Sequence, residues 1–246
     1  MESELQKRFR DLASRAAARG IYTQTAFLTQ KEQEELAALS LPIAYRLEGV
    51  FPEAERRVAV FGSEEEFGYP PEESLALLKI APKDEKFAVE ISHRDCLGAL
   101  MALGIRRDQI GDIVTVGKRA YFAVLRTMAA YCMEGIDRVG KNSVSVTEER
   151  DLPSEAEPRW EERLITAASA RADAVVAAVY DLSRAEGKAL FEKERVSING
   201  AICRSPAREL CGGERVSVRG FGRFYYDGAV GETRSGRCRI AVRIFL

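Results

Sequence analysis

The first half of the chain shows apolar residues at helical spacing near its start and alternating patterns after that. Leu5, Phe9 and Leu12 recur every three to four residues and predict a helix that ends before Gly20. A T-x-x-E pattern beginning at Thr29 has the form of a capping box and predicts a second helix. The chain therefore begins with two helices.

Strand patterns dominate the next hundred residues. Alternating or β-rich runs predict strands in "IAYRLEGV", "RRVAVFG", "KFAVEIS", "QIGDIVTVGKRAYFAVL" and "NSVSVTE". Between them, "EEEFGYPPEE" is predicted to be a loop, and the period of "SLALLKIAP" fits a strand or a helix. Ser92 is a suitable cap for a helix that stops at Gly104, and "RTMAAYCMEGIDRVG" is predicted to be helical up to Gly140. The mixture indicates an α+β fold.

A change in composition divides the chain near residue 150. The segment "EERDLPSEAEP", residues 148–158, is acidic and contains two prolines, as linkers often do. We therefore expect four parts: an N-terminal α+β region over 1–83, a central α+β segment over 84–147, the linker, and a small domain with additional C-terminal strands over 159–246.

The small domain has two helix starts and a hairpin. Ser169 is predicted to cap a helix that runs through Asp181, and the S-R-A-E capping box at Ser183 opens another. Asn199-Gly200 is a strong hairpin signal, because both central residues of a type I′ turn need positive φ. Arg184 and Lys188 are four residues apart and so lie on one face of the second helix. Folding alone does not explain that face.

The composition excludes several other classes of protein. The 246 residues are 46% hydrophobic and 30% charged, no apolar run approaches the roughly 18 residues of a membrane span, and no secretory signal is evident, so we expect a cytoplasmic protein. Five cysteines without a C-x-x-C pair support neither a disulfide framework nor a zinc site.

The net charge is -1, yet residues 159–246 hold 16 Lys and Arg against 11 Asp and Glu. This basic third permits binding to a polyanion.

Several spaced motifs in the basic third resemble the RNA-binding domain named after ribosomal protein S-four, the αL motif. An R-x-D, then S-R, then V-x-I-N-G and a G-E-x-V strand match at Arg171, Asp173, Ser183, Arg184, Val196, Asn199, Gly200, Gly213 and Glu214. Ala172 replaces the usual leucine of R-L-D, a departure that affects packing more than RNA contact.

A second segment, "SHRDCLGALMALGIRRDQIGDIVTVGKRAYFAV" over 92–124, is similar to the signature of the YlmH family. This resemblance implies an N-terminal α/β region like an RNA-recognition motif, followed by a C-terminal domain of the S-four type. It also implies binding to structured rRNA or tRNA on the large ribosomal subunit carrying peptidyl-tRNA, in quality control of stalled translation, and a link to cell division.

The resemblance and the charge pattern together predict the RNA contacts. Phosphates of folded RNA need cations at fixed spacing, and arginine can bind two oxygens at once. The predicted contacts are Arg171, Ser183, Arg184, Lys188, Arg195, Asn199 and Arg204, with Arg106 and Arg107 as a secondary site. Ser183 is first a cap and Asn199 first a turn residue, while Asp173 is a candidate to orient Arg171 or Arg184. We expect no catalytic residue, metal, cofactor, small-molecule substrate or membrane partner.

Three alternatives remain open. An RNA-modifying enzyme resembling a pseudouridine synthase would use the same domain as an anchor, although the first 150 residues offer no convincing catalytic Asp. A division-site scaffold is another. "RGFGRFYY" partly matches the aromatic strand of an RNA-recognition motif, so Phe221 or Tyr225 are candidates to stack on a base. His93, the one histidine, has no second histidine for a metal site.

Overall fold

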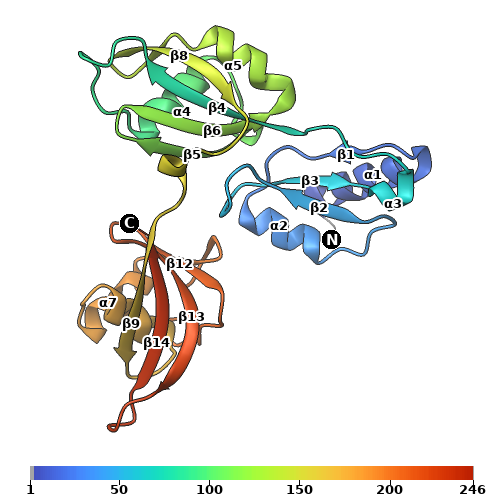
Figure 1. Ribbon diagram of the computed structural model, residues 1–246. Coiled ribbons are helices and arrows are strands. Elements are labelled where there is room, and N and C mark those ends of the chain that lie inside the picture. The colour runs from blue at the N-terminus through green and yellow to red at the C-terminus, as the bar shows by residue number, and fades with distance from the viewer. Residues whose placement is uncertain (1–2, 246) are drawn as a thin grey trace. The chain divides into compact units, whose positions relative to one another are not determined.

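The computed structural model describes residues 3–245, which fold into two compact units with their boundary between Glu157 and Pro158. Both units combine helices with antiparallel sheets, so the fold is α+β as predicted (Figure 1). Within the described residues, no helix is both long enough and apolar enough to span a bilayer.

The first unit begins with a small sheet covered by helices. A Ser3 capping box starts the first helix, and Gly20 ends it with a φ of 64°. Its apolar stripe, which includes Phe9 and Leu12, packs against the sheet. The three strands have the order β1-β3-β2, fewer than the four of an RNA-recognition motif. The elements are α1 Glu4–Arg19, β1 Thr23–Gln24, α2 Gln30–Ala37, β2 Tyr45–Glu48, β3 Val58–Phe61 and α3 Glu64–Phe67.

A five-stranded antiparallel sheet of order β5-β6-β4-β8-β7 forms the rest of the first unit. One face packs on α4 and α5, and the other buries Leu77 and Tyr121 against Phe27, which lies between β1 and α2, and Val60 of β3. The period-2 alternation of strand side chains produces these two buried faces. The elements are β4 Leu75–Pro82, α4 His93–Ala102, η1 Arg107–Gln109, β5 Ile110–Val116, β6 Arg119–Leu125, η2 Arg126–Met128, α5 Ala129–Gly135, β7 Arg138–Val139, β8 Asn142–Glu149 and η3 Ser154–Ala156.

The strand predicted in "KFAVEIS" does not form. Phe87 is 77% exposed, and the amide side chain of Asn142 bonds both the N–H and the C=O of Val89 at 2.9 Å. These are the main-chain groups that a neighbouring strand would bond, so a side chain replaces the expected ladder.

Two helices in the first unit also differ from prediction. The acidic segment predicted as a loop contains α3, because Ser63 accepts the Glu66 N–H and three glutamates occupy the favourable first turn. The helix predicted to reach Gly140 ends at Gly135, and the next residues pair with β8 as β7. Pairing along the sheet therefore overrides local helical spacing there.

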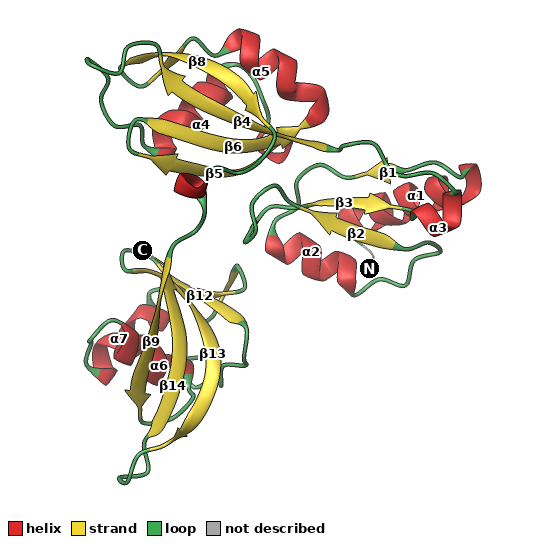
Figure 2. Cartoon of the chain, viewed as in Figure 1, coloured by secondary structure: helices red, strands yellow, loops and turns green. Residues whose placement is uncertain are grey.

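The second unit is a six-stranded antiparallel sheet with two helices on one face (Figure 2). The strand order is β11-β10-β12-β13-β14-β9, so β9, which was not predicted, pairs with β14 over its whole length. The elements are β9 Trp160–Ala167, α6 Ala172–Val179, α7 Arg184–Glu192, β10 Val196–Ile198, β11 Ala201–Ile202, β12 Glu214–Val218, β13 Gly222–Glu232 and β14 Cys238–Phe245.

The Asn199-Gly200 hairpin is confirmed. Both residues have positive φ, 48° and 83°, as a type I′ turn requires. The Asn199 side-chain oxygen also accepts the Arg215 N–H at 3.0 Å, which ties the hairpin to β12.

The start of α6 differs from prediction, because Ser169 does not cap it. The N-cap is Arg171, and the N–H groups of Ala172 and Asp173 donate instead to the carbonyls of Arg208 and Pro206 at 2.7 and 3.0 Å. Main-chain carbonyls of the loop before β12 thus satisfy the amides that a capping side chain would serve. The helix also ends at Val179, before Asp181.

Candidate RNA interface

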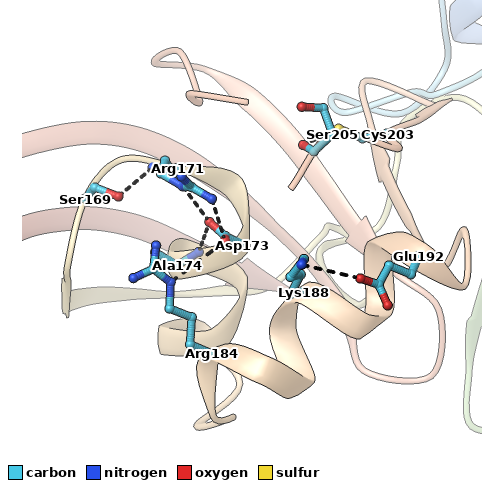
Figure 3. Close-up of polar contacts among 9 residues, drawn as sticks. All are labelled: Ser169, Arg171, Asp173, Ala174, Arg184, Lys188, Glu192, Cys203 and Ser205. Carbon is cyan, nitrogen blue, oxygen red and sulfur yellow. Dashed lines mark hydrogen bonds and ion pairs between the residues drawn. The ribbon is translucent and has the colours of Figure 1, made fainter. Parts of the chain in front are cut away.

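A buried carboxylate in the second unit lies beside two of the predicted arginines. Asp173 is 2% exposed, and it accepts hydrogen bonds from Arg171 Nε at 3.1 Å and Nη2 at 2.9 Å (Figure 3). The Ala174 N–H donates to the same carboxylate at 2.9 Å, and Arg184 Nε lies 3.9 Å from it. The hydrogen bond to Asp173 raises the pKa of Arg171. The hydrogen bonds fix Arg171 on this anion, and Arg184 from a separate helix lies at ion-pair distance from it.

The second helix of this unit begins as the capping box predicts. Ser183 Oγ accepts the Glu186 N–H at 3.2 Å, and Glu186 accepts the Ser183 N–H at 2.8 Å. Hydrogen bonds to the Glu186 carboxylate from the Ser183 side chain and main chain lower its pKa. The cap makes Arg184 the first residue of α7, next to Asp173 on α6. Contact between Ser183 and RNA remains a prediction.

A glycine that sequence reasoning missed sets the spacing of α6 and α7. A Cβ at Gly187 would lie 2.9 Å from the Asp173 carbonyl oxygen and 3.0 Å from Ala177 Cβ. Both distances are shorter than normal contacts, so only glycine permits this approach of α7 to α6. A glycine inside a helix costs about 1 kcal/mol relative to alanine. A glycine in the middle of a predicted helix was therefore the sequence signal for a close packing contact.

Arg184 and Lys188 lie on α7 one turn apart, as predicted, and are 61% and 59% exposed (Figure 3). Lys188 Nζ lies 3.7 Å from Glu192. An exposed i,i+4 pair of this kind contributes only about 0.3–0.5 kcal/mol, so a phosphate can replace the glutamate at little cost. Rigid placement and exposure together make this pair suitable for phosphate binding.

The remaining predicted contacts of this unit surround the hairpin. Arg204 is 75% exposed and its Nε donates to Glu194 at 2.8 Å. The Arg195 guanidinium lies against Gly220 in the turn between β12 and β13, where a Cβ would be 2.8 Å from its Nη2. The Asn199 side chain accepts the Arg215 N–H and so stabilises the hairpin. Arg171 and Arg184 therefore meet at Asp173, whereas Arg195 and Arg204 are held by other neighbours.

The two arginines of the secondary site differ in the first unit. Arg106 is 69% exposed and bonds Asp108 through Nε and Nη2 at 3.0 and 3.1 Å. Arg107 Nη1 instead donates to the carbonyls of Ile110 and Gly111 at 2.7 and 3.1 Å. Burial, followed by the neighbouring Arg56, lowers the pKa of Arg107. Arg106 is thus accessible to an anion, while Arg107 donates inward to the main chain.

The aromatic segment contributes to two clusters. Phe221 packs against Tyr180 with ring centroids 5.4 Å apart. Tyr225 lies on the sheet face away from the helices, where the Arg243 guanidinium stands 4.8 Å from its ring and 5.5 Å from that of Trp160. This strand is one of six in an antiparallel sheet with two helices, so the segment is not part of the βαββαβ frame of an RNA-recognition motif.

The cysteines and the histidine were considered for thiol, acid–base or metal chemistry. Burial raises the pKa of the Cys96 thiol to about 12 and that of Cys132 to about 11. His93 is the first residue of α4, directly after the Ser92 cap. Over residues 3–245, no group of three or more His, Cys, Asp or Glu side chains has an arrangement that could hold a metal ion.

Comparison with known proteins relates both units to one family. The family model described as "Putative RNA-binding domain in YlmH" matches residues 71–152, which form β4 to β8 and the helices between them. The ribosome-associated protein quality control protein P2 of Bacillus subtilis (strain 168) is 30% identical over 220 residues, covering 88% of this chain and 84% of that protein. A solved structure, the cell division protein ylmH from Streptococcus pneumoniae, has 21% identity and a TM-score of 0.46, covering 61% of this chain and 93% of that one. With a relative aligned along most of both sequences, this chain belongs to the YlmH family.

Proposed function

We propose that this chain is a non-catalytic RNA-binding protein of ribosome-associated quality control. The name of the Bacillus subtilis relative and the description of the matching family model support the process and the kind of ligand. The observation that carries the proposal is the pair of exposed cations on α7, Arg184 and Lys188, with Arg184 placed beside the buried Asp173. The helix fixes the spacing of their backbone positions, so less has to be ordered when phosphates bind.

The finer proposal concerns the target and the binding unit. Residues 171–218 would act as an αL-type domain of the S-four kind that recognises structured rRNA or tRNA in the cytoplasm, on the large subunit carrying peptidyl-tRNA. Double-helical RNA hides its base edges in a deep, narrow major groove, so recognition would depend on shape and backbone. The two helices and the hairpin supply cations at fixed spacing for that purpose. The name of the Streptococcus pneumoniae protein motivates a further role linked to cell division.

The test is binding to purified large ribosomal subunits and to structured RNA over a range of salt concentrations. Arg184→Ala combined with Lys188→Ala is expected to weaken binding and to reduce the slope of log K against log salt by about two, as for two lost phosphate contacts. The control, Lys7→Ala with Lys31→Ala, removes two exposed charges from the first unit and should leave the slope unchanged. Equal behaviour of the two double variants would refute the proposed interface.

The non-catalytic part needs its own measurement. Mass spectrometry of rRNA and tRNA from a deletion strain should show every modification of the parent strain. A modification that disappears on deletion and returns with the gene would instead favour an RNA-modifying enzyme.

A further inference from the structure

A cleft in the second unit lies beside the proposed phosphate-binding face. It has a volume of about 610 Å³ and is lined by residues 163–168 at the end of β9 and just after it, by alanines of α6, and by Arg184 and Arg237. This size is within the range of small-ligand pockets, roughly 300–1,000 Å³. Because Arg184 lines it, a ligand in the cleft would be continuous with RNA bound along α7.

The side of the cleft that α6 forms is apolar, and its side chains are small. Ala174, Ala177 and Ala178 line the cleft with single methyl groups. Ile165 and Ala167 of β9, which face the helices, line the cleft across from them. The small side chains of α6 leave room beside this edge of the sheet for a flat apolar group, such as a nucleobase.

The polar groups at the cleft favour an anion on its rim. Arg184 and Arg237 both line it, and Arg163 does so while bonded to Glu161 at 2.9 Å. Arg237 Nη2 donates to the Thr166 carbonyl at 3.2 Å. A guanidinium has five N–H donors, so this bond leaves Arg237 able to bind a phosphate as well. Asp181 is the one carboxylate in the lining.

The β9 side also carries main-chain hydrogen-bonding groups. In the described part of the chain β9 is the last strand of its sheet, with β14 as its neighbour. The N–H and C=O groups on the other side of such an edge strand are available to a ligand. Together with the Asp181 carboxylate they can bond the edge of a base, which carries both donors and acceptors.

We propose that this cleft binds one unpaired nucleotide of the RNA. The base lies between β9 and the alanines of α6, its amino group donates to Asp181, and its phosphate lies between Arg184 and Arg237. A peptide would match the strand edge alone, whereas a nucleotide also matches the flat apolar wall and the arginine rim. This inference rests on the proposed function, and it adds recognition of a nucleotide outside the helix to binding of the backbone.

The test compares two RNA hairpins that differ by one bulged nucleotide, each titrated with the full-length chain. Wild-type protein is expected to prefer the bulged hairpin by about fivefold or more, the smallest effect expected from stacking one base. Ala178→Trp, which fills the cleft, and Arg237→Ala, which removes a rim charge, should abolish most of that preference. Arg239→Ala removes an exposed charge two residues further along, in β14 and outside the cleft, and should preserve the preference.

The outcomes separate this inference from the proposed function. If Arg184→Ala with Lys188→Ala weakens binding to both hairpins but the wild-type protein shows no preference for the bulge, the cleft proposal is wrong and RNA binding stands. A preference that survives both Arg237→Ala and Ala178→Trp also overturns it. If the protein binds neither hairpin nor ribosomes, the proposed function itself fails. Arg237→Ala changes an exposed side chain, so the test does not depend on whether Ala178→Trp folds.

Discussion

Replacing Gly187 with alanine should destabilise the second unit, although the same change stabilises most helices. In a helix with open space around it, Gly→Ala stabilises by about 0.8–1.0 kcal/mol through backbone propensity. At Gly187 the new methyl group would lie 2.9 Å from the carbonyl oxygen of Asp173. A main-chain oxygen cannot rotate away, so α7 must move away from α6.

The net magnitude follows from these two opposing effects. Overpacking of a well-packed contact costs about 1–3 kcal/mol, which exceeds the gain in helix propensity. We expect a net loss of about 1 kcal/mol. The displacement would also separate Arg184 from Asp173, so RNA binding should weaken even though no cation has been removed.

A second glycine provides a matched control. Gly98 lies inside α4, and a Cβ there would have no neighbour within 4 Å. Gly98→Ala should therefore stabilise the first unit by about 0.5–1 kcal/mol. The two variants are chemically identical changes with opposite predicted signs.

Urea unfolding measured with two probes can distinguish the second unit from the whole chain. Trp160 is the one tryptophan in the sequence and lies in β9, so its fluorescence reports on the second unit. Far-UV circular dichroism follows the whole chain, including the first unit. A lower midpoint for Gly187→Ala at unchanged m is the expected result. If Gly187→Ala raises the midpoint as Gly98→Ala does, the close approach of α6 and α7 does not limit stability and the reasoning is refuted.

Three further predictions concern the turn, the cap and the thiols. Asn199→Ala should lower the unfolding free energy of the second unit by about 2 kcal/mol in urea, because alanine is strained at positive φ and one hydrogen bond is lost. Asn199→Gly loses only the hydrogen bond and should cost about 1 kcal/mol. Equal costs would contradict the argument from φ. Hydrogen bonds from Ser183 lower the pKa of Glu186 from 4.5, so they stabilise the folded state above pH 4.5, and this contribution is lost as the pH falls through the lowered value. The difference in unfolding free energy between wild type and Ser183→Ala should therefore shrink on acidification. A difference that stays constant with pH would refute this. Iodoacetamide should modify the exposed Cys211 well before the buried Cys96 in the folded protein, as peptide mass spectrometry can check, and equal rates would show that Cys96 is accessible.

Local patterns in the sequence predicted those elements whose stability is local. The capping box at Ser183 and the positive-φ pair beginning at Asn199 act over a few residues, and the structure contains both as expected. The final strand, with Ile240 and Val242 buried and Arg239 and Arg243 on the other face, follows from period-2 alternation in the same way.

The features that were missed depend on distant partners. The residues of β9 are mostly exposed, so they lack a clear apolar alternation, and they form a strand because β14 pairs with them from Ala167↔Cys238 to Trp160↔Phe245. Ser169 was predicted as a cap, but the loop before β12 supplies carbonyls to the first turn of α6 instead. The meaning of Gly187 also depends on α6, which local spacing does not place beside it.

The charge of the second unit explains how a chain with a net charge of -1 can present a basic face. Many of its carboxylates are next to arginines or lysines, as Asp173, Glu192 and Glu194 are, and these pairs hold the cations in place. Exposed pairs are weak, so an incoming phosphate can displace Glu192 or Glu194 from its partner. Asp173 is different, because it is buried and hydrogen-bonded and stays with Arg171. In the proposed interface one carboxylate therefore fixes Arg171 while the others can release their cations to phosphates. For this reason we expect binding to depend strongly on salt even though the chain is nearly neutral.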